Sequence, residues 1–177
     1  MATQNIILAG FGGQGILFAG KVMAYCGLME GKEVSWLPSY GPEMRGGTAN
    51  CSVCLSDEPI SSPLVLNPDV LIAMNGPSYD KFANVMAKDG KIFIDSTLVN
   101  GKKFPDGVAV FEVPATQLAQ DQDLSGLANI ILLGKVLKET QFASMEAVKK
   151  GIEKCVPPSK THLIEANMRA IQLGMSL

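Results

Sequence analysis

The stretch from Asn5 to Gly15, NIILAGFGGQG, decides the fold of this 177-residue chain. Its apolar half predicts a short buried strand, and its glycine-rich half, followed at once by a helical pattern, predicts a tight turn into a helix. Gly10, Gly12 and Gly15 satisfy the G-x-G-x-x-G spacing, which lets a phosphate approach bare backbone. The helix would direct its free N–H groups and the positive end of its dipole at a ligand above the loop. The stretch therefore predicts a strand–loop–helix unit with a candidate anion site.

The acidic residue that completes a dinucleotide fingerprint is missing. A nicotinamide or flavin domain places this residue at the end of its second strand, where it holds the ribose hydroxyls. Here the second predicted strand runs from Glu33 to Leu37, and Glu33 stands at its start, at the opposite edge of the sheet. Ordinary NAD binding is therefore disfavoured, and the glycine loop alone does not identify its ligand.

Length and composition favour one cytoplasmic α/β domain over residues 1–177. The net charge is −2 and the 15 basic residues are scattered, so we expect no nucleic-acid partner. Apolar residues make up 47% of the chain, yet no uncharged apolar run is long enough to cross a bilayer. The first residues do not read as a signal peptide. We therefore expect no membrane association.

The four cysteines do not form a metal-binding pattern. Cys51 and Cys54 make a single C-x-x-C, while Cys26 and Cys155 are distant and His162 is the sole histidine. Zinc and iron–sulfur sites normally use two such close pairs, or one pair followed by histidines. Residues three apart in a strand also point to opposite faces of the sheet. We expect small buried thiols and no metal ligands.

Hydrophobic periodicity and the positions of glycine and proline divide the rest of the chain into strands and helices. Further strands are predicted over residues 33–37, 48–55, 69–74, 91–95 and 108–113. Helices are predicted over residues 14–29, 76–88, 114–122, 127–138 and 144–155, and from about 161 onward. This order predicts a single doubly wound, mostly parallel, Rossmann-like sheet with helices on both faces and a hairpin-like insert.

Two loops together carry a family resemblance. Residues 10–15, GFGGQG, and residues 38–47, PSYGPEMRGG, are similar to the two signature segments of the gamma subunit of 2-oxoacid:ferredoxin oxidoreductases. That family includes the pyruvate, 2-oxoglutarate, 2-oxoisovalerate and indolepyruvate enzymes. Shorter matches extend the resemblance over nearly the whole chain, at residues 56–60, 68–73, 95–96, 113–116 and 129.

The resemblance implies a subunit of an enzyme that oxidatively decarboxylates a 2-oxoacid to an acyl-CoA, with coenzyme A as co-substrate, and reduces ferredoxin. It also implies that thiamine diphosphate, magnesium and iron–sulfur clusters belong to partner alpha and beta subunits and to a ferredoxin-like delta subunit. This sequence has no G-D-G…N segment for thiamine and magnesium. We expect this chain alone to bind no cofactor, to carry no catalytic residue, and to be inactive. An isolated chain is expected to self-associate through an apolar docking face.

The loop of residues 38–47 supplies the strongest candidate for ligand contact. Arg45 lies among glycines, and its planar guanidinium suits a phosphate or a carboxylate. Glu43 would position Arg45, and Tyr40 would pack on the loop or stack on a base. In a right-handed βαβ unit both loops leave the same edge of the sheet, so we predict that they converge on one anion. The alternatives are an exposed arginine that bonds Glu43, or one that contacts a partner subunit.

The remaining candidates lie at strand ends. Gln14 begins the first helix and could offer its amide to the same anion. Asn75 and Ser96 follow predicted strands, where doubly wound folds bind ligands, although each also fits a helix or turn cap. The predicted binding set is Gly12, Gly13, Gln14, Gly15, Tyr40, Glu43, Arg45 and Asn75. Two alternative functions stay open: a stand-alone nucleotide- or small-anion-binding module, and an autonomous NAD oxidoreductase.

Overall fold

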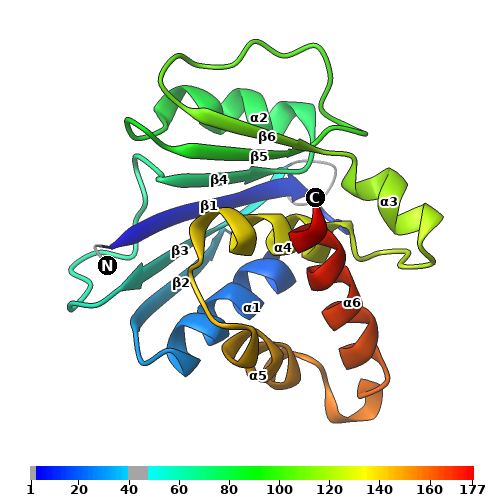
Figure 1. The fold of residues 1–177 in the computed structure, drawn as a ribbon. Coiled ribbons are helices and arrows are strands. Elements are labelled where there is room, and N and C mark those ends of the chain that lie inside the picture. Colours follow the sequence, from blue (N-terminus) through cyan, green and yellow to red (C-terminus); the bar gives the residue numbers. More distant parts are fainter. Residues whose placement is uncertain (1–2, 40–47) are drawn as a thin grey trace.

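The computed structural model describes residues 3–39 and 48–177, in which six strands form one sheet (Figure 1). The strands are β1 (Gln4–Phe11), β2 (Glu33–Ser39), β3 (Thr48–Ser56), β4 (Val70–Ala73), β5 (Lys91–Asp95) and β6 (Ala109–Val113). The α-helices are α1 (Ile16–Met29), α2 (Gly76–Phe82), α3 (Ala115–Asp121), α4 (Ala128–Thr140), α5 (Met145–Cys155) and α6 (Leu163–Ser176). The described residues also form the 3₁₀ turns η2 (Ala83–Val85) and η3 (Pro158–Lys160). The predicted α/β fold class is confirmed.

The strand order β2-β3-β1-β4-β5-β6 explains the hairpin-like insert. β1, β4, β5 and β6 pair in parallel, whereas β3 lies between β1 and β2 and runs antiparallel to both. The chain winds from β1 to β2 through α1, and in the opposite direction from β4 to β5 through α2. The winding therefore reverses between β1 and β4, and the crevice beyond such a point is where doubly wound folds bind ligands.

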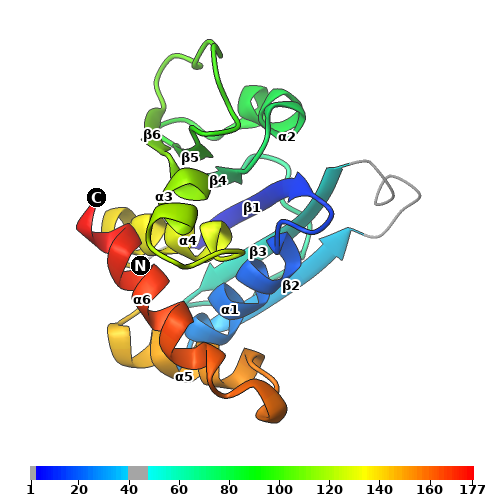
Figure 2. The same ribbon diagram turned by 90° about the vertical axis from the view of Figure 1, so that its right-hand side faces the viewer.

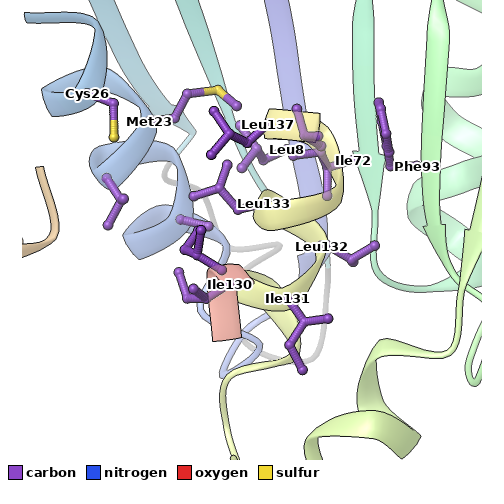
Figure 3. Close-up of a cluster of buried hydrophobic side chains, with 14 of the residues drawn as sticks. Leu8, Met23, Cys26, Ile72, Phe93, Ile130, Ile131, Leu132, Leu133 and Leu137 are labelled. Atoms are coloured by element: carbon purple, nitrogen blue, oxygen red, sulfur yellow. The ribbon is translucent and has the colours of Figure 1, made fainter. Parts of the chain in front are cut away.

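The helices divide unequally between the two faces of the sheet (Figures 1 and 2). Ile6 and Leu8 of β1 join the large core beneath α1, α3, α4, α5 and α6, while Ile7 and Ala9 face α2. Figure 3 shows Leu8 among the side chains of Met23 and of residues in α4. Since each fully buried large aliphatic side chain contributes roughly 1.5–3 kcal/mol, the face with five helices dominates the stability of the fold.

Helices α4 and α6 are packed backbone to backbone. A Cβ atom added at Gly174 would collide with the carbonyl oxygen of Ile131, and one at Gly134 would collide with that of Ile171. Only glycine permits so close an approach of two helices. These positions therefore require glycine for packing, which periodicity in the sequence does not reveal.

Two of the helix boundaries that differ from their predictions have local reasons. α1 begins at Ile16 rather than residue 14 because Gly15 adopts a left-handed conformation at its N-cap. The helix predicted over residues 76–88 ends as α2 at Phe82 and continues only as the 3₁₀ turn η2. Residues 67–68 form hydrogen bonds there with backbone groups that a longer helix would use itself. The Asn67 amide donates to the carbonyl of Val85 (3.0 Å), and the N–H of Ala87 donates to the carbonyl of Pro68 (2.9 Å).

Within the described ranges, none of the helices combines the length and the apolar character needed to cross a membrane.

Candidate functional site

The glycine loop lies at the carboxyl edge of the sheet, next to the point where the winding reverses. Its turn is closed by the N–H of Gln14, which donates to the carbonyl of Phe11 (3.2 Å). Gly13 (φ 93°) and Gly15 (φ 72°) both occupy the left-handed region that favours glycine. Among the described residues, a Cβ atom on Gly13 would meet no atom within 4 Å, whereas one on Gly15 would collide with the side-chain amide of Asn129. No described side chain therefore covers Gly13, and Gly15 packs against the start of α4.

The N-terminus of α1 is open above this loop. Across the part of the chain that the structure describes, no side chain caps α1, and its first turn holds no acidic residue. The free N–H groups and the positive end of the dipole are thus not compensated by a described side chain. This arrangement favours an anion at the loop.

Gln14 and Asn75, two residues of the predicted binding set, are hydrogen-bonded to each other. The Oε1 atom of Gln14 accepts from the N–H of Phe11 (2.6 Å) and from Nδ2 of Asn75 (3.3 Å), and its Nε2 atom donates to the carbonyl of Met74 (3.1 Å). Asn75 also caps α2, since its Oδ1 atom accepts from the N–H of Ser78 (2.8 Å). Both amides therefore brace the loop, and direct contact of either with a ligand stays a prediction.

Asp95, at the end of β5, is a residue of this edge that the sequence analysis did not select. Its carboxylate is fully buried and accepts from the N–H of Thr97 (3.1 Å) and from the N–H (3.2 Å) and hydroxyl of Thr116. These bonds fix the start of α3 against the end of β5. The next residue, Ser96, was predicted instead. Asp95 could have been found as a carboxylate that ends a buried strand and precedes two hydroxyl residues.

Asn129 is the second residue that the predicted binding set lacks. It lies in the first turn of α4, is only 4% exposed, and donates from Nδ2 to the carbonyl of Gly15 (2.9 Å). Its contact holds the glycine loop against α4, 114 residues further along the chain. The signal in the sequence was a single amide at the start of an otherwise apolar helix.

A pocket of about 270 Å³ opens between the glycine loop and α3. Residues after β1, β4, β5 and β6 contribute to its walls, which places it at the carboxyl edge of the parallel strands. Its lining is formed by Gly13, Gln14, Met74, Leu98, Thr116, Ala119, Gln120, Ser125, Gly126 and Ala128. None of these described lining residues carries a charge. One member of each hydrogen-bond network lines this pocket: Gln14, which is bonded to Asn75, and Thr116, which is bonded to Asp95.

Tyr40, Glu43 and Arg45 lie in residues 40–47, outside the described residues, so their predicted contacts stay predictions. The described ends of this segment are placed by the sheet register: Ser39 pairs with Asn50, and Thr48 pairs with Phe11. The segment thus leaves and re-enters the sheet at the edge that carries the glycine loop.

The cysteines are free thiols. Cys51 faces α1 in the large core, whereas the thiol of Cys54 donates to Oδ1 of Asn5 on the other face, so the predicted opposition of this pair is confirmed. Burial raises the pKa of Cys51 to about 12, and burial followed by the neighbouring Cys155 raises the pKa of Cys26 to about 12. Thiols of such high pKa are poor nucleophiles and poor metal ligands. Residues 3–39 and 48–177 hold no group of three or more histidine, cysteine, aspartate or glutamate side chains placed to bind a metal ion.

Comparison with known proteins places this chain in a family. Residues 5–177 match the family described as pyruvate ferredoxin/flavodoxin oxidoreductase. The chain is 36% identical over 174 residues to the 2-oxoglutarate synthase subunit KorC of Methanocaldococcus jannaschii, covering 97% of this chain and 91% of KorC. It is 39% identical over 171 residues to the ketoisovalerate oxidoreductase subunit VorA of Methanothermobacter thermautotrophicus, covering 96% of this chain but only 35% of VorA.

Solved structures agree with this placement. The crystal structure of the gamma subunit of a keto/oxoacid ferredoxin oxidoreductase from Geobacter sulfurreducens superposes with a TM-score of 0.85 at 30% identity. The alignment covers 99% of this chain and 96% of that subunit. The chain therefore belongs to the pyruvate ferredoxin/flavodoxin oxidoreductase family and is of the gamma-subunit type.

Proposed function

We propose that this chain works as the gamma subunit of a 2-oxoacid:ferredoxin oxidoreductase and supplies a phosphate-binding site for coenzyme A at its glycine loop. The observation that carries the proposal is the N-terminus of α1, which no described side chain caps, next to Gly13, which no described atom covers. Backbone N–H groups at a helix start bind phosphate without needing a charged side chain. The loop therefore has the chemistry to hold one of the phosphates of coenzyme A.

Arg45 is proposed as the charged partner of this loop. Its segment begins after Ser39 and ends at Thr48, which pairs with Phe11 at the start of the glycine loop. A guanidinium forms paired, charge-assisted hydrogen bonds with phosphate oxygens, which a helix terminus alone does not provide. Glu43 is proposed to orient Arg45, and Tyr40 to pack against the same segment.

The decarboxylation and electron-transfer chemistry is proposed to take place on partner subunits. Thiamine diphosphate with magnesium would be carried by the alpha and beta subunits, and iron–sulfur clusters by a beta or ferredoxin-like delta subunit. This chain's own part is to bind and orient coenzyme A and to dock against those partners. Self-association of the isolated chain stays a prediction.

The test is replacement of Arg45 in the assembled enzyme. Arg45→Ala is expected to raise the KM for coenzyme A by roughly one to two orders of magnitude, since a charge-assisted hydrogen bond contributes about 1.5–3 kcal/mol. Arg45→Lys should restore part of the affinity because it keeps the charge and loses the planar fork. Arg169, the other arginine of the chain, lies exposed on α6 and donates to the carbonyl of Gln122 (3.3 Å), so Arg169→Ala is the matched control.

A wild-type KM in a normally assembled Arg45→Ala enzyme would refute the proposed site. Failed assembly with unchanged affinity for coenzyme A would instead make Arg45 an interface residue. Purification of the natural protein without any thiamine- or cluster-bearing partner would favour the stand-alone anion-binding module.

A further inference from the structure

We infer that the face of β2 and β3 that is turned away from the large core binds a partner subunit, the one whose counterpart forms the rest of the VorA chain. This inference rests on the proposed function, because it requires that this chain assembles with partner subunits. It specifies which surface binds the partner and what chemistry the partner's surface needs.

Strands β2 and β3 carry helices on one side only. Trp36 of β2 and Val53 of β3 pack in the large core beneath α1, whereas the adjacent residues Leu37 and Ser52 line a pocket on the opposite face. On that side α2 packs against β1 and β4, and Figure 2 shows β2 and β3 extending past it. Among the described elements, no helix therefore covers these two strands on the α2 side of the sheet.

Exposed apolar side chains gather at this face. Leu37 is 38% exposed, and Leu64 and Leu66, in the connection from β3 to β4, are 64% and 77% exposed. Leu37 and Leu64 line the same pocket, which has a volume of about 360 Å³. The amide of Asn67 donates to the carbonyl of Val85 (3.0 Å), so the connection continues from Leu66 to another exposed apolar residue. We call Leu37, Leu64, Leu66 and Val85 the apolar band; such a group of exposed apolar side chains is typical of a protein interface.

The chemistry of the pocket indicates what kind of surface it fits. None of its described lining residues is charged, and they are Leu37, Pro38, Ser39, Asn50, Ser52 and Leu64. The core of a protein interface is depleted of charge in the same way. An acidic or basic partner surface would bury its charges here without a counter-charge, which is strongly unfavourable. A partner surface with apolar side chains and a few hydroxyl or amide groups would find matching groups.

The relatives indicate which partner this is. The match covers 91% of KorC, so in that protein this unit forms nearly a whole subunit. In VorA the matching region makes up 35% of one longer chain. The same unit therefore occurs both separately and joined by the backbone to a second protein unit. Where the backbone does not join the two, a stable interface of about 1,200–2,000 Å² has to hold them together.

The test is assembly of the full chain with the thiamine- and cluster-bearing partners that co-purify with it. Leu64→Asp places a carboxylate in the pocket wall and should weaken the association of this chain with its partners roughly tenfold or more, because the charge would be buried without a counter-charge. Mass photometry of a dilution series measures the dissociation. Leu163→Asp is the matched control, because Leu163 is also exposed (37%) but begins α6, on the side of the sheet with five helices. Its association should equal that of the wild type.

A second variant tests the pocket volume without adding a charge. The indole of Ser52→Trp would occupy the pocket from its strand wall and should weaken the association by a similar factor, whereas Ser52→Ala should not. Circular dichroism of the isolated chains should show that all these variants are folded, because Leu64 and Ser52 lie outside the large core.

Wild-type association of both Leu64→Asp and Ser52→Trp would overturn the inference. An apolar band that only joins two copies of this chain would also overturn it: Leu64→Asp would then abolish self-association of the isolated chain and leave association with the partners unchanged. Failure of the proposed coenzyme A site reads differently. The complex would then assemble, and Leu64→Asp would weaken it as expected, while coenzyme A would not slow hydrogen exchange at the glycine loop.

Discussion

The glycines of the α4–α6 contact and those of the loop before α1 look alike in the sequence but have different structural roles. At Gly174 and Gly134 there is no space for a Cβ atom, because the carbonyl oxygens of the facing helix occupy it. At Gly13 the backbone is left-handed, and a Cβ atom would meet no atom of the described residues within 4 Å. The first two glycines allow two helices to touch, and the third leaves room above a helix terminus.

This difference separates stability from binding. A glycine whose Cβ position is occupied by a neighbouring helix contributes to packing, so its replacement should destabilise the fold before it affects any ligand. At a glycine with positive φ and no neighbour at its Cβ position, replacement causes only modest backbone strain. Such a replacement should preserve the fold and mainly affect a ligand bound there. The two regions therefore give predictions that differ in kind as well as in size.

The largest effect is expected at the helix contact. Gly174→Ala should lower the free energy of unfolding by about 3 kcal/mol, because overpacking forces α4 and α6 apart. Urea unfolding followed by circular dichroism measures this loss. Gln172→Ala, on the exposed side of the same helix, should change the free energy by less than about 0.5 kcal/mol. A Gly174→Ala protein as stable as wild type would mean that the two helices can separate freely, and the contrast would fail.

A smaller and more selective effect is expected in the loop. Gly13→Ala should lower the free energy of unfolding by about 1 kcal/mol, the penalty of a left-handed alanine. Gly107→Ala is its control, since Gly107 also has positive φ (76°) and open space but lies before β6, at the opposite edge of the sheet. Both variants should lose similar stability, and only Gly13→Ala should raise the KM for coenzyme A in the assembled enzyme. Equal KM values for the two variants would contradict a ligand at the glycine loop.

Much of the fold was predictable because local patterns agree with the final packing. The apolar run of residues 91–95 became β5 with the same bounds. The helix predicted over residues 14–29 buries Ile16, Ala19, Met23 and Cys26, which are spaced three or four residues apart. The end of α2 was not predictable, because it is set by hydrogen bonds from residues 67–68, which lie outside that helix.

Less of the candidate site could be predicted. The glycine loop, Gln14 and Asn75 stand out because they follow strands, and the structure joins them. Asp95 and Asn129 escaped selection because their partners lie 21 and 114 residues away in sequence, at Thr116 and Gly15. Of the α3 residues in the pocket wall, only Thr116 lies in a segment that resembles the family, and none was selected, because α3 comes beside the loop only when the sheet places β6.

Hydrogen exchange of the loop backbone tests the central claim most directly. In the assembled enzyme, saturating coenzyme A should slow exchange in peptides that cover residues 10–18, because a phosphate would accept hydrogen bonds from N–H groups there. 3′,5′-ADP should slow the same peptides, and peptides from α6 should exchange at an unchanged rate with either ligand. Unchanged exchange in residues 10–18 at saturating coenzyme A would contradict a phosphate site at the glycine loop.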